Sequence, residues 1–105
     1  MKRKAYIKWL GDTGIERVRF SLDIDKGIVK NVMVQYESLI NDTWTPIVRY
    51  DCAHGIFHRD IMYPDGRKEK QAIVIRSLED AVLYAEQDII DHWKIYKQHY
   101  IRKKK

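Results

Sequence analysis

Cysteine and proline are almost absent from this chain of 105 residues, which holds one Cys and two Pro. A single Cys excludes a disulfide within the chain and is typical of a reducing compartment, so we expect a cytoplasmic protein. No apolar run approaches the roughly 20 residues that a membrane-spanning helix requires, and the basic N-terminus lacks the apolar segment of a signal peptide. We therefore expect no association with a membrane.

The sequence motifs of several large enzyme classes are missing as well. The chain has no Gly-rich phosphate-binding loop, no GxSxG nucleophile elbow and no dinucleotide-binding fingerprint. It also has no Cys pair and no helical HExxH motif, which would indicate a zinc site. We therefore predict that the protein works without a cofactor.

The length of the chain allows one domain, residues 1–105. Charged residues make up 33% of it, and the formal net charge is +5. Much of the excess positive charge lies in two terminal clusters, residues 2–4 and 102–105. A basic balance permits an anionic partner, and we consider RNA for that role, with residues 101–105 as a basic tail.

Turn signals divide the first three quarters of the chain at regular intervals. They fall at residues 11–14, 25–27, 41–43, 53–55 and 63–66. The segments between them are short and rich in Val, Ile, Tyr and Trp, and residues 16–24 alternate cleanly between apolar and polar side chains. Because such short connections favour antiparallel neighbours, we predict a meander of five or six strands over about residues 4–75.

The apolar period changes after Ser77. Ser77 and Asp80 form a pattern that is typical of a helix start, and apolar residues then recur at steps of three and four up to Tyr100. We predict one long helix over about residues 78–100, and hence an α+β fold with this helix packed on one face of an antiparallel sheet. The other face of the sheet is then wet, paired with a second subunit, or used for binding.

The stretch "RYDCAHGIFHRD", residues 49–60, holds two His, two Asp, two Arg and the single Cys of the sequence within twelve residues. A two-residue loop at 53–54 would place Arg49 opposite His58, whereas a three-residue loop would place Tyr50 there. Under the first register, alternation of side chains puts a compact acid–base patch on the face that the helix leaves uncovered. This patch comprises Arg49, Asp51, His58 and Asp60.

Such a patch suits a metal-independent ribonuclease. A His beside a carboxylate is biased toward its protonated form and suits acid–base catalysis near neutral pH. In this hypothesis His54 and His58 move protons, Asp51 or Asp60 orients a His, and Arg49 holds a phosphate. Further basic residues are predicted to bind the nucleic acid, namely Arg59, Lys68, Lys70, Arg102 and Lys103.

Three other interpretations stay open at this point. His58 and Asp60 stand on one strand face as two metal ligands, and Asp51 would be a third. Arg–Asp pairs across the strands and a hydrogen-bonded His would explain the same residues without any activity. A non-catalytic module would bind a protein or nucleic acid on the uncovered face, as a homodimer or beside a partner. Its exposed apolar residues would include Ile47, Ile56 and Met62.

The segment from Val48 to Lys70 resembles the signature of small uncharacterised prokaryotic proteins, which carry a Tyr-Asp-x-Ala-His-Gly core, a following His-x-Asp and a Pro-Asp-Gly turn. The layout also resembles that of the TumE-like toxins of toxin–antitoxin pairs, through Arg49, Tyr50, Asp51, Ala53, His54 and His58. The resemblance implies a cytoplasmic toxin that acts on RNA or translation and is held by a small antitoxin-like protein.

Overall fold

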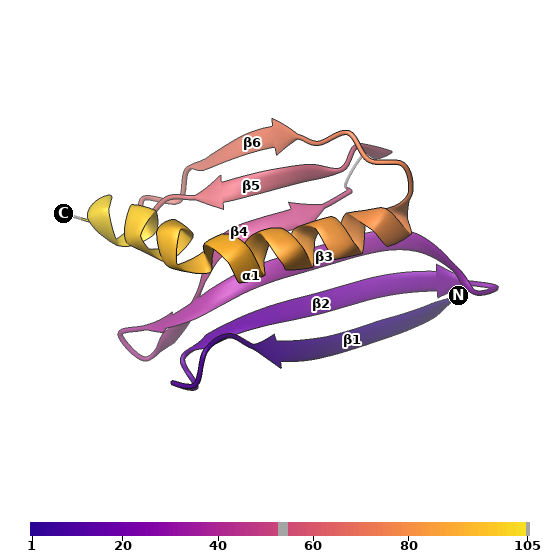
Figure 1. The fold of residues 1–105 in the computed structure, drawn as a ribbon. Helices are drawn as coiled ribbons and strands as arrows, with labels where there is room; N and C mark the ends of the chain where they lie inside the picture. The colour runs from indigo at the N-terminus through magenta and orange to yellow at the C-terminus, as the bar shows by residue number, and fades with distance from the viewer. Residues whose placement is uncertain (53–54, 105) are drawn as a thin grey trace.

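The structure is a computed structural model that describes residues 1–52 and 55–104. Within those residues the chain forms six strands followed by one helix (Figure 1). The strands are β1 (Lys2–Trp9), β2 (Glu16–Asp25), β3 (Ile28–Ile40), β4 (Thr43–Asp51), β5 (His58–Met62) and β6 (Lys68–Ala72), and the helix is α1 (Leu78–Arg102). The predicted α+β fold with an antiparallel meander is confirmed.

All six strands belong to one sheet in the order of the sequence, and each pairs antiparallel with the next. Two-residue loops close the β2–β3 and β3–β4 hairpins. Both loops have positive φ at their two residues, at Lys26–Gly27 and at Asn41–Asp42. This geometry matches the twist of the flanking strands, which explains why Gly, Asn and Asp mark these turns in the sequence.

Helix α1 begins where the sequence predicts. The Ser77 side chain accepts a hydrogen bond from the Asp80 amide at 3.1 Å, so Ser77 is the N-cap. The helix ends at Arg102, two residues later than expected. Ile101 and Arg102 therefore belong to the helix, and the predicted basic tail is shorter than residues 101–105.

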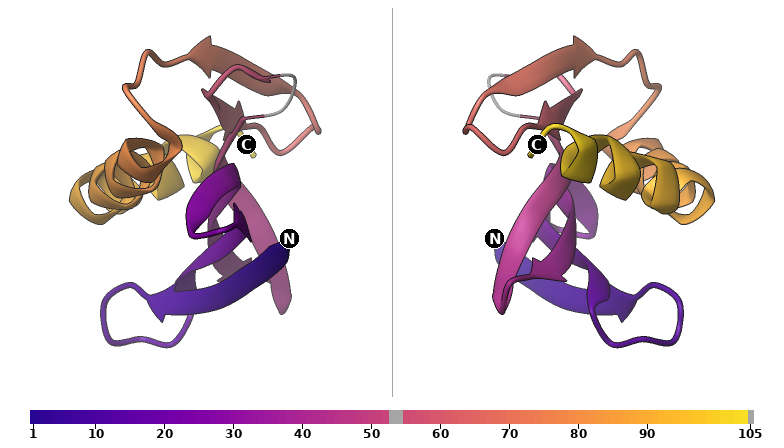
Figure 2. Two further views of the ribbon diagram at one scale, coloured as in Figure 1. Left: turned by 90° about the vertical axis from the view of Figure 1, so that its right-hand side faces the viewer. Right: turned by 90° about the vertical axis from the view of Figure 1, so that its left-hand side faces the viewer.

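The helix lies along one face of a strongly twisted sheet (Figures 1 and 2). Ala81, Ala85 and Ile89 are completely buried against the strands, and Trp93 packs edge-on against Tyr36 of β3. The core between the two layers is completed by side chains of the central strands, among them Val18, Phe20, Val34, Val48 and Tyr50.

The β4–β5 hairpin differs from both predicted registers. Asp51 lies opposite His58, and Arg49 lies opposite Asp60. The two-residue loop would have paired Arg49 with His58, so the observed register differs from it by two residues. The connection is longer than expected, because Gly55 turns at φ 79° and donates to the Cys52 carbonyl at 3.1 Å, and Ile56 and Phe57 precede the strand. A shift of one residue would move each side chain to the other face, but a shift of two residues does not. The side chains of β4 and β5 therefore lie on the faces that the two-residue loop predicts.

Candidate functional site

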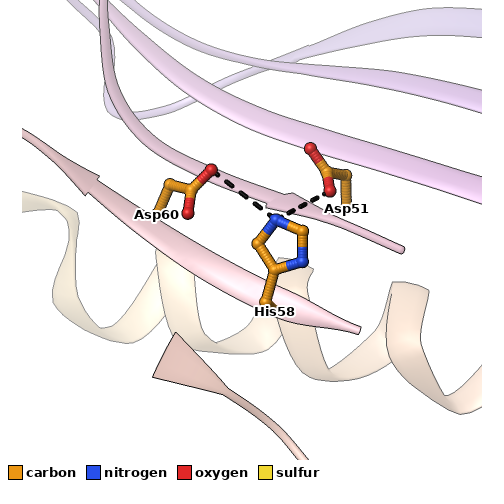
Figure 3. Close-up of side chains that lie close together, drawn as sticks. All are labelled: Asp51, His58 and Asp60. Carbon is orange, nitrogen blue, oxygen red and sulfur yellow. Dashed lines mark ion pairs between the residues drawn. The ribbon is translucent and has the colours of Figure 1, made fainter. Parts of the chain in front are cut away.

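Three side chains of the β4–β5 hairpin meet on the face of the sheet away from α1 (Figure 3). The Nε2 atom of His58 lies 2.9 Å from Oδ1 of Asp51 and 3.6 Å from Oδ2 of Asp60. One potential ligand atom from each residue lies within 4.8 Å of the other two. We call this group the Asp51–His58–Asp60 cluster.

The cluster is less exposed to solvent than expected from the sequence. Only 5% of the His58 side chain and 3% of the Asp60 side chain are exposed, whereas Asp51 is somewhat more accessible. The other ring nitrogen of His58, Nδ1, lies 3.1 Å from the Ile56 carbonyl oxygen. A carbonyl oxygen can only accept, so Nδ1 carries a hydrogen and Nε2 is the atom that faces the two carboxylates.

Asp60 is incompletely satisfied. Its Oδ1 atom is buried and has no hydrogen-bond partner among the described residues. Its Oδ2 atom faces His58 and lies 3.8 Å from the Lys68 ammonium. Buried carboxylate oxygens normally have partners, so an unpartnered one indicates either strain or a missing ligand.

Arg49 connects the cluster to the surface. Its Nε atom donates to Oδ2 of Asp51 at 3.0 Å, while 44% of its side chain stays exposed. Arg49 also lines an open groove of about 740 Å³ on the same face. The other basic residues of this groove are Arg3 and Arg19, which were not predicted from the sequence as site residues.

The strand register explains why these basic residues share one face. Cross-strand partners point to the same side of a sheet, and one row of partners runs across all six strands. That row consists of Ile7, Arg19, Gln35, Arg49, Asp60 and Lys70. Lys68 lies two residues from Lys70 and therefore joins it on this face, where both are exposed.

Arg59 lies on the opposite face from Lys68 and Lys70. Its guanidinium donates to the Asp88 carboxylate of α1 at 3.2 Å and to the Tyr96 hydroxyl at 3.0 Å. These contacts occupy Arg59 within the layer between helix and sheet. Arg59 therefore contributes to packing between helix and sheet, and its contact with nucleic acid stays a prediction.

Asp88 accepts hydrogen bonds from the hydroxyls of Tyr50 and Tyr96 as well. Burial opposes its ionisation, but these bonds and the charge of Arg59 outweigh burial and hold the pKa of the carboxyl below its usual value. Burial, and then the bond to Asp88, raise the pKa of Tyr96 to about 12. This polar group inside the interface was not foreseen, because its members are far apart in the sequence.

The remaining predicted residues are dispersed. His54 lies outside the described residues, and so does Ala53 of the resemblance. Arg102 ends the helix and Lys103 follows it, both exposed. Of the apolar residues expected on a docking face, Ile56 is exposed and Met62 is half-buried, but Ile47 is almost fully buried. The expectation of an exposed Ile47 is therefore wrong.

The described part of the chain contains no helix with the length and apolar character needed to cross a membrane. The cytoplasmic location, the homodimer, the antitoxin-like partner and the TumE-like resemblance stay predictions.

Comparison with known proteins identifies the family of this chain. No curated protein and no solved structure is significantly similar to this chain. One domain family, described as a domain of unknown function (DUF7718), matches residues 1–105. Since this match spans the whole sequence, the chain belongs to the DUF7718 family.

Proposed function

We propose that this protein binds single-stranded RNA on the face of its sheet away from α1. The observation that carries the proposal is the convergence of Arg3, Arg19 and Arg49 on one groove of about 740 Å³. Lys68 and Lys70 extend the positive charge along the same face to β6. Phosphate contacts supply most of the affinity in nucleic-acid binding, so a basic groove is the expected footprint.

The groove arginines keep donors for phosphate although each is paired with a carboxylate. Arg3 pairs with Asp23 at 2.9 Å, and Arg19 pairs with Glu37 at 3.1 Å. A guanidinium carries five N–H donors in a planar fork, and one carboxylate engages only one or two of them. The acids therefore hold the guanidinium groups in position, and the exposed donors stay accessible to a ligand.

An aromatic cluster lies beside the groove on the same face. Trp9 is more than half exposed, and its ring lies 6.0 Å from that of Trp44. The Arg17 guanidinium stacks over Trp44 at 3.8 Å. Trp9 and Arg17 are each two residues from groove residues on β1 and β2, which places them next to the groove. Exposed aromatic rings beside a basic groove bind single strands by stacking with bases.

Fluorescence anisotropy with a labelled RNA oligonucleotide, titrated at several salt concentrations, tests this proposal. Substituting Arg3 or Lys70 by Ala should weaken binding and lower the salt slope by about one per residue. The Trp9→Ala variant should lose about 1–3 kcal/mol of binding free energy with little change in slope. The matched control is Lys94→Ala, which removes an exposed charge from the helix.

Two results would contradict the proposal: a wild type that does not bind, or a Lys94→Ala variant that loses as much affinity as Arg3→Ala. A DNA oligonucleotide of the same sequence belongs in the same experiment. The expected preference for RNA follows from the resemblance to RNA-directed toxins, and equal affinity for DNA would remove that part of the proposal.

Cleavage of the bound RNA is a second candidate function. The contact of 2.9 Å between Asp51 and His58, beside Arg49, is the observation that favours it, because a carboxylate that orients a His suits the His for acid–base catalysis. Incubation of RNA with the wild type should then give products that His58→Asn does not give, with RNA affinity retained. Identical degradation by both proteins would assign the activity to a contaminant or to another site.

A further inference from the structure

We infer that the Asp51–His58–Asp60 cluster is a binding site for a divalent transition-metal ion, such as Zn²⁺ or Mn²⁺. Three features of the structure support this site: the arrangement of the three side chains, the orientation of the His58 ring and the buried oxygen of Asp60. The site does not depend on RNA binding.

Two distances within the cluster are close to those between two ligands of one metal ion. Two ligand atoms that each lie about 2.1 Å from one ion are about 3.0 Å apart in octahedral geometry and about 3.4 Å apart in tetrahedral geometry. The Nε2 atom of His58 lies 2.9 Å from one carboxylate oxygen and 3.6 Å from the other. The three ligand atoms lie within 4.8 Å of one another, so the two carboxylates would have to move toward a shared ion to bind it.

The His58 ring is oriented as in a typical metal ligand. Its Nδ1–H group donates to the Ile56 carbonyl at 3.1 Å, which fixes the ring and directs Nε2 into the cluster. Ligating His residues usually donate their second N–H to a carbonyl or carboxylate in this way. Because Nδ1 already donates to the Ile56 carbonyl, Nε2 can face the two carboxylates only if it carries a proton or binds a cation. A cation would also bind the Asp60 carboxylate.

Asp60 gives the second, independent observation. Only 3% of its side chain is exposed, and Oδ1 has no hydrogen-bond partner within the residues that the structure describes. A buried carboxylate oxygen without a partner is costly, since it has lost its hydration. The oxygen that faces His58 is Oδ2, so a metal ion would supply the missing partner of Oδ1 by binding both oxygens of the Asp60 carboxylate.

The basic neighbours allow an ion in the cluster. Arg49 donates to the outer oxygen of Asp51, Oδ2, so Oδ1 is the oxygen directed at His58. Lys68 is more than half exposed and lies 3.8 Å from Asp60, so its flexible chain can turn toward solvent. One imidazole with two carboxylates suits Zn²⁺ or Mn²⁺ better than Mg²⁺, which prefers oxygen ligands and water.

Isothermal titration calorimetry of the metal-free protein with ZnCl₂ and with MnCl₂ tests the inference. We expect one ion per chain with the wild type and a loss of more than about tenfold in affinity for Asp60→Asn. Asp23→Asn is the matched control, because it makes the same change on the same face outside the cluster. It should bind like the wild type.

A second variant, Asp51→Asn, and a second measurement, the absorption of bound Co²⁺, complete the experiment. Should Asp60→Asn fail to fold, Asp51→Asn takes its place, since that side chain is closer to the surface. With Co²⁺ as a probe, the wild type should give visible absorption bands that the cluster variant lacks. A wild type that binds neither Zn²⁺ nor Mn²⁺, or a cluster variant that binds as tightly as Asp23→Asn, would overturn the inference. Neither outcome affects the RNA proposal, which is measured with Arg3, Lys70 and Trp9.

Discussion

The Arg59 guanidinium of β5 lies 3.2 Å from the Asp88 carboxylate of α1 and joins the sheet to the helix by an ion pair. Both side chains are mostly buried. The hydroxyls of Tyr50 and Tyr96 donate to the same carboxylate. Three side chains, one each from β4, β5 and α1, thus contact the Asp88 carboxylate between helix and sheet, which makes the position of the helix sensitive to Asp88.

Removing the charge of Asp88 should destabilise the protein strongly. In Asp88→Asn the Arg59 guanidinium stays mostly buried without a counter-charge, and we expect a loss of roughly 2–4 kcal/mol in the free energy of unfolding. Urea denaturation followed by circular dichroism measures this loss. Asp91→Asn, an exposed change in the same helix, is the control, and equal losses in the two variants would refute the role of Asp88.

The same carboxylate should make stability depend on acid pH. The pKa of Asp88 is lowered in the folded protein, so at acid pH the unfolded chain binds a proton more readily than the folded chain. Its contribution is complete above the unfolded pKa and is lost as the pH falls from about 5 through the folded pKa. Urea denaturation between pH 7 and pH 3 should therefore show the gap between wild type and Asp88→Asn shrinking. A constant gap would show that ionisation of Asp88 is not what stabilises the fold.

Two neighbouring isoleucines should respond very differently to truncation. Ile89 is completely buried between helix and sheet, while 49% of Ile90 is exposed. Ile89→Ala removes packing and leaves a cavity, so we expect a loss of about 2–5 kcal/mol. Ile90→Ala should cost well under half as much. Thermal and urea unfolding of the pair measure the difference, and similar costs would mean that the helix packs through another face.

The cap at Ser77 should contribute measurably to helix stability. Its side chain accepts from the Asp80 amide at 3.1 Å, which satisfies one of the unpaired N–H groups at the start of α1. Ser77→Ala should lower the free energy of unfolding by about 1 kcal/mol, and Ser77→Asp, which keeps an acceptor, should lower it much less. If both variants unfold alike in urea, the cap is not the reason for the helix start.

The strands and the helix were predictable because their signals are local. Residues 16–24 alternate with period two, and the β2 strand that forms there has one buried side. The turn chemistry at Gly27 and at Asn41–Asp42 fixes two-residue hairpins, since those residues tolerate positive φ. Ser77 sets the helix start in the same local way.

The composition of the acid–base patch was also predictable, because side chains alternate strictly along a strand. The face that carries Arg49, Asp51, His58 and Asp60 is the face that the sequence predicts, although the pairing differs by two residues. Such a shift preserves the face and changes the neighbours. Direct pairing of Asp51 with His58 is therefore a result of the tertiary structure.

By itself, the sequence determined the order and type of the elements, the start of the helix and the residues that share each sheet face. Those properties follow from local turn chemistry and from the periods of strands and helices. The tertiary structure decided that His58 and Asp60 are buried, that Arg59 pairs with Asp88 and that Arg3 and Arg19 join Arg49 at one groove. Burial and long-range pairing depend on the twist of the sheet and on the docking of the helix, which bring together residues whose separation in the sequence carries no local signal.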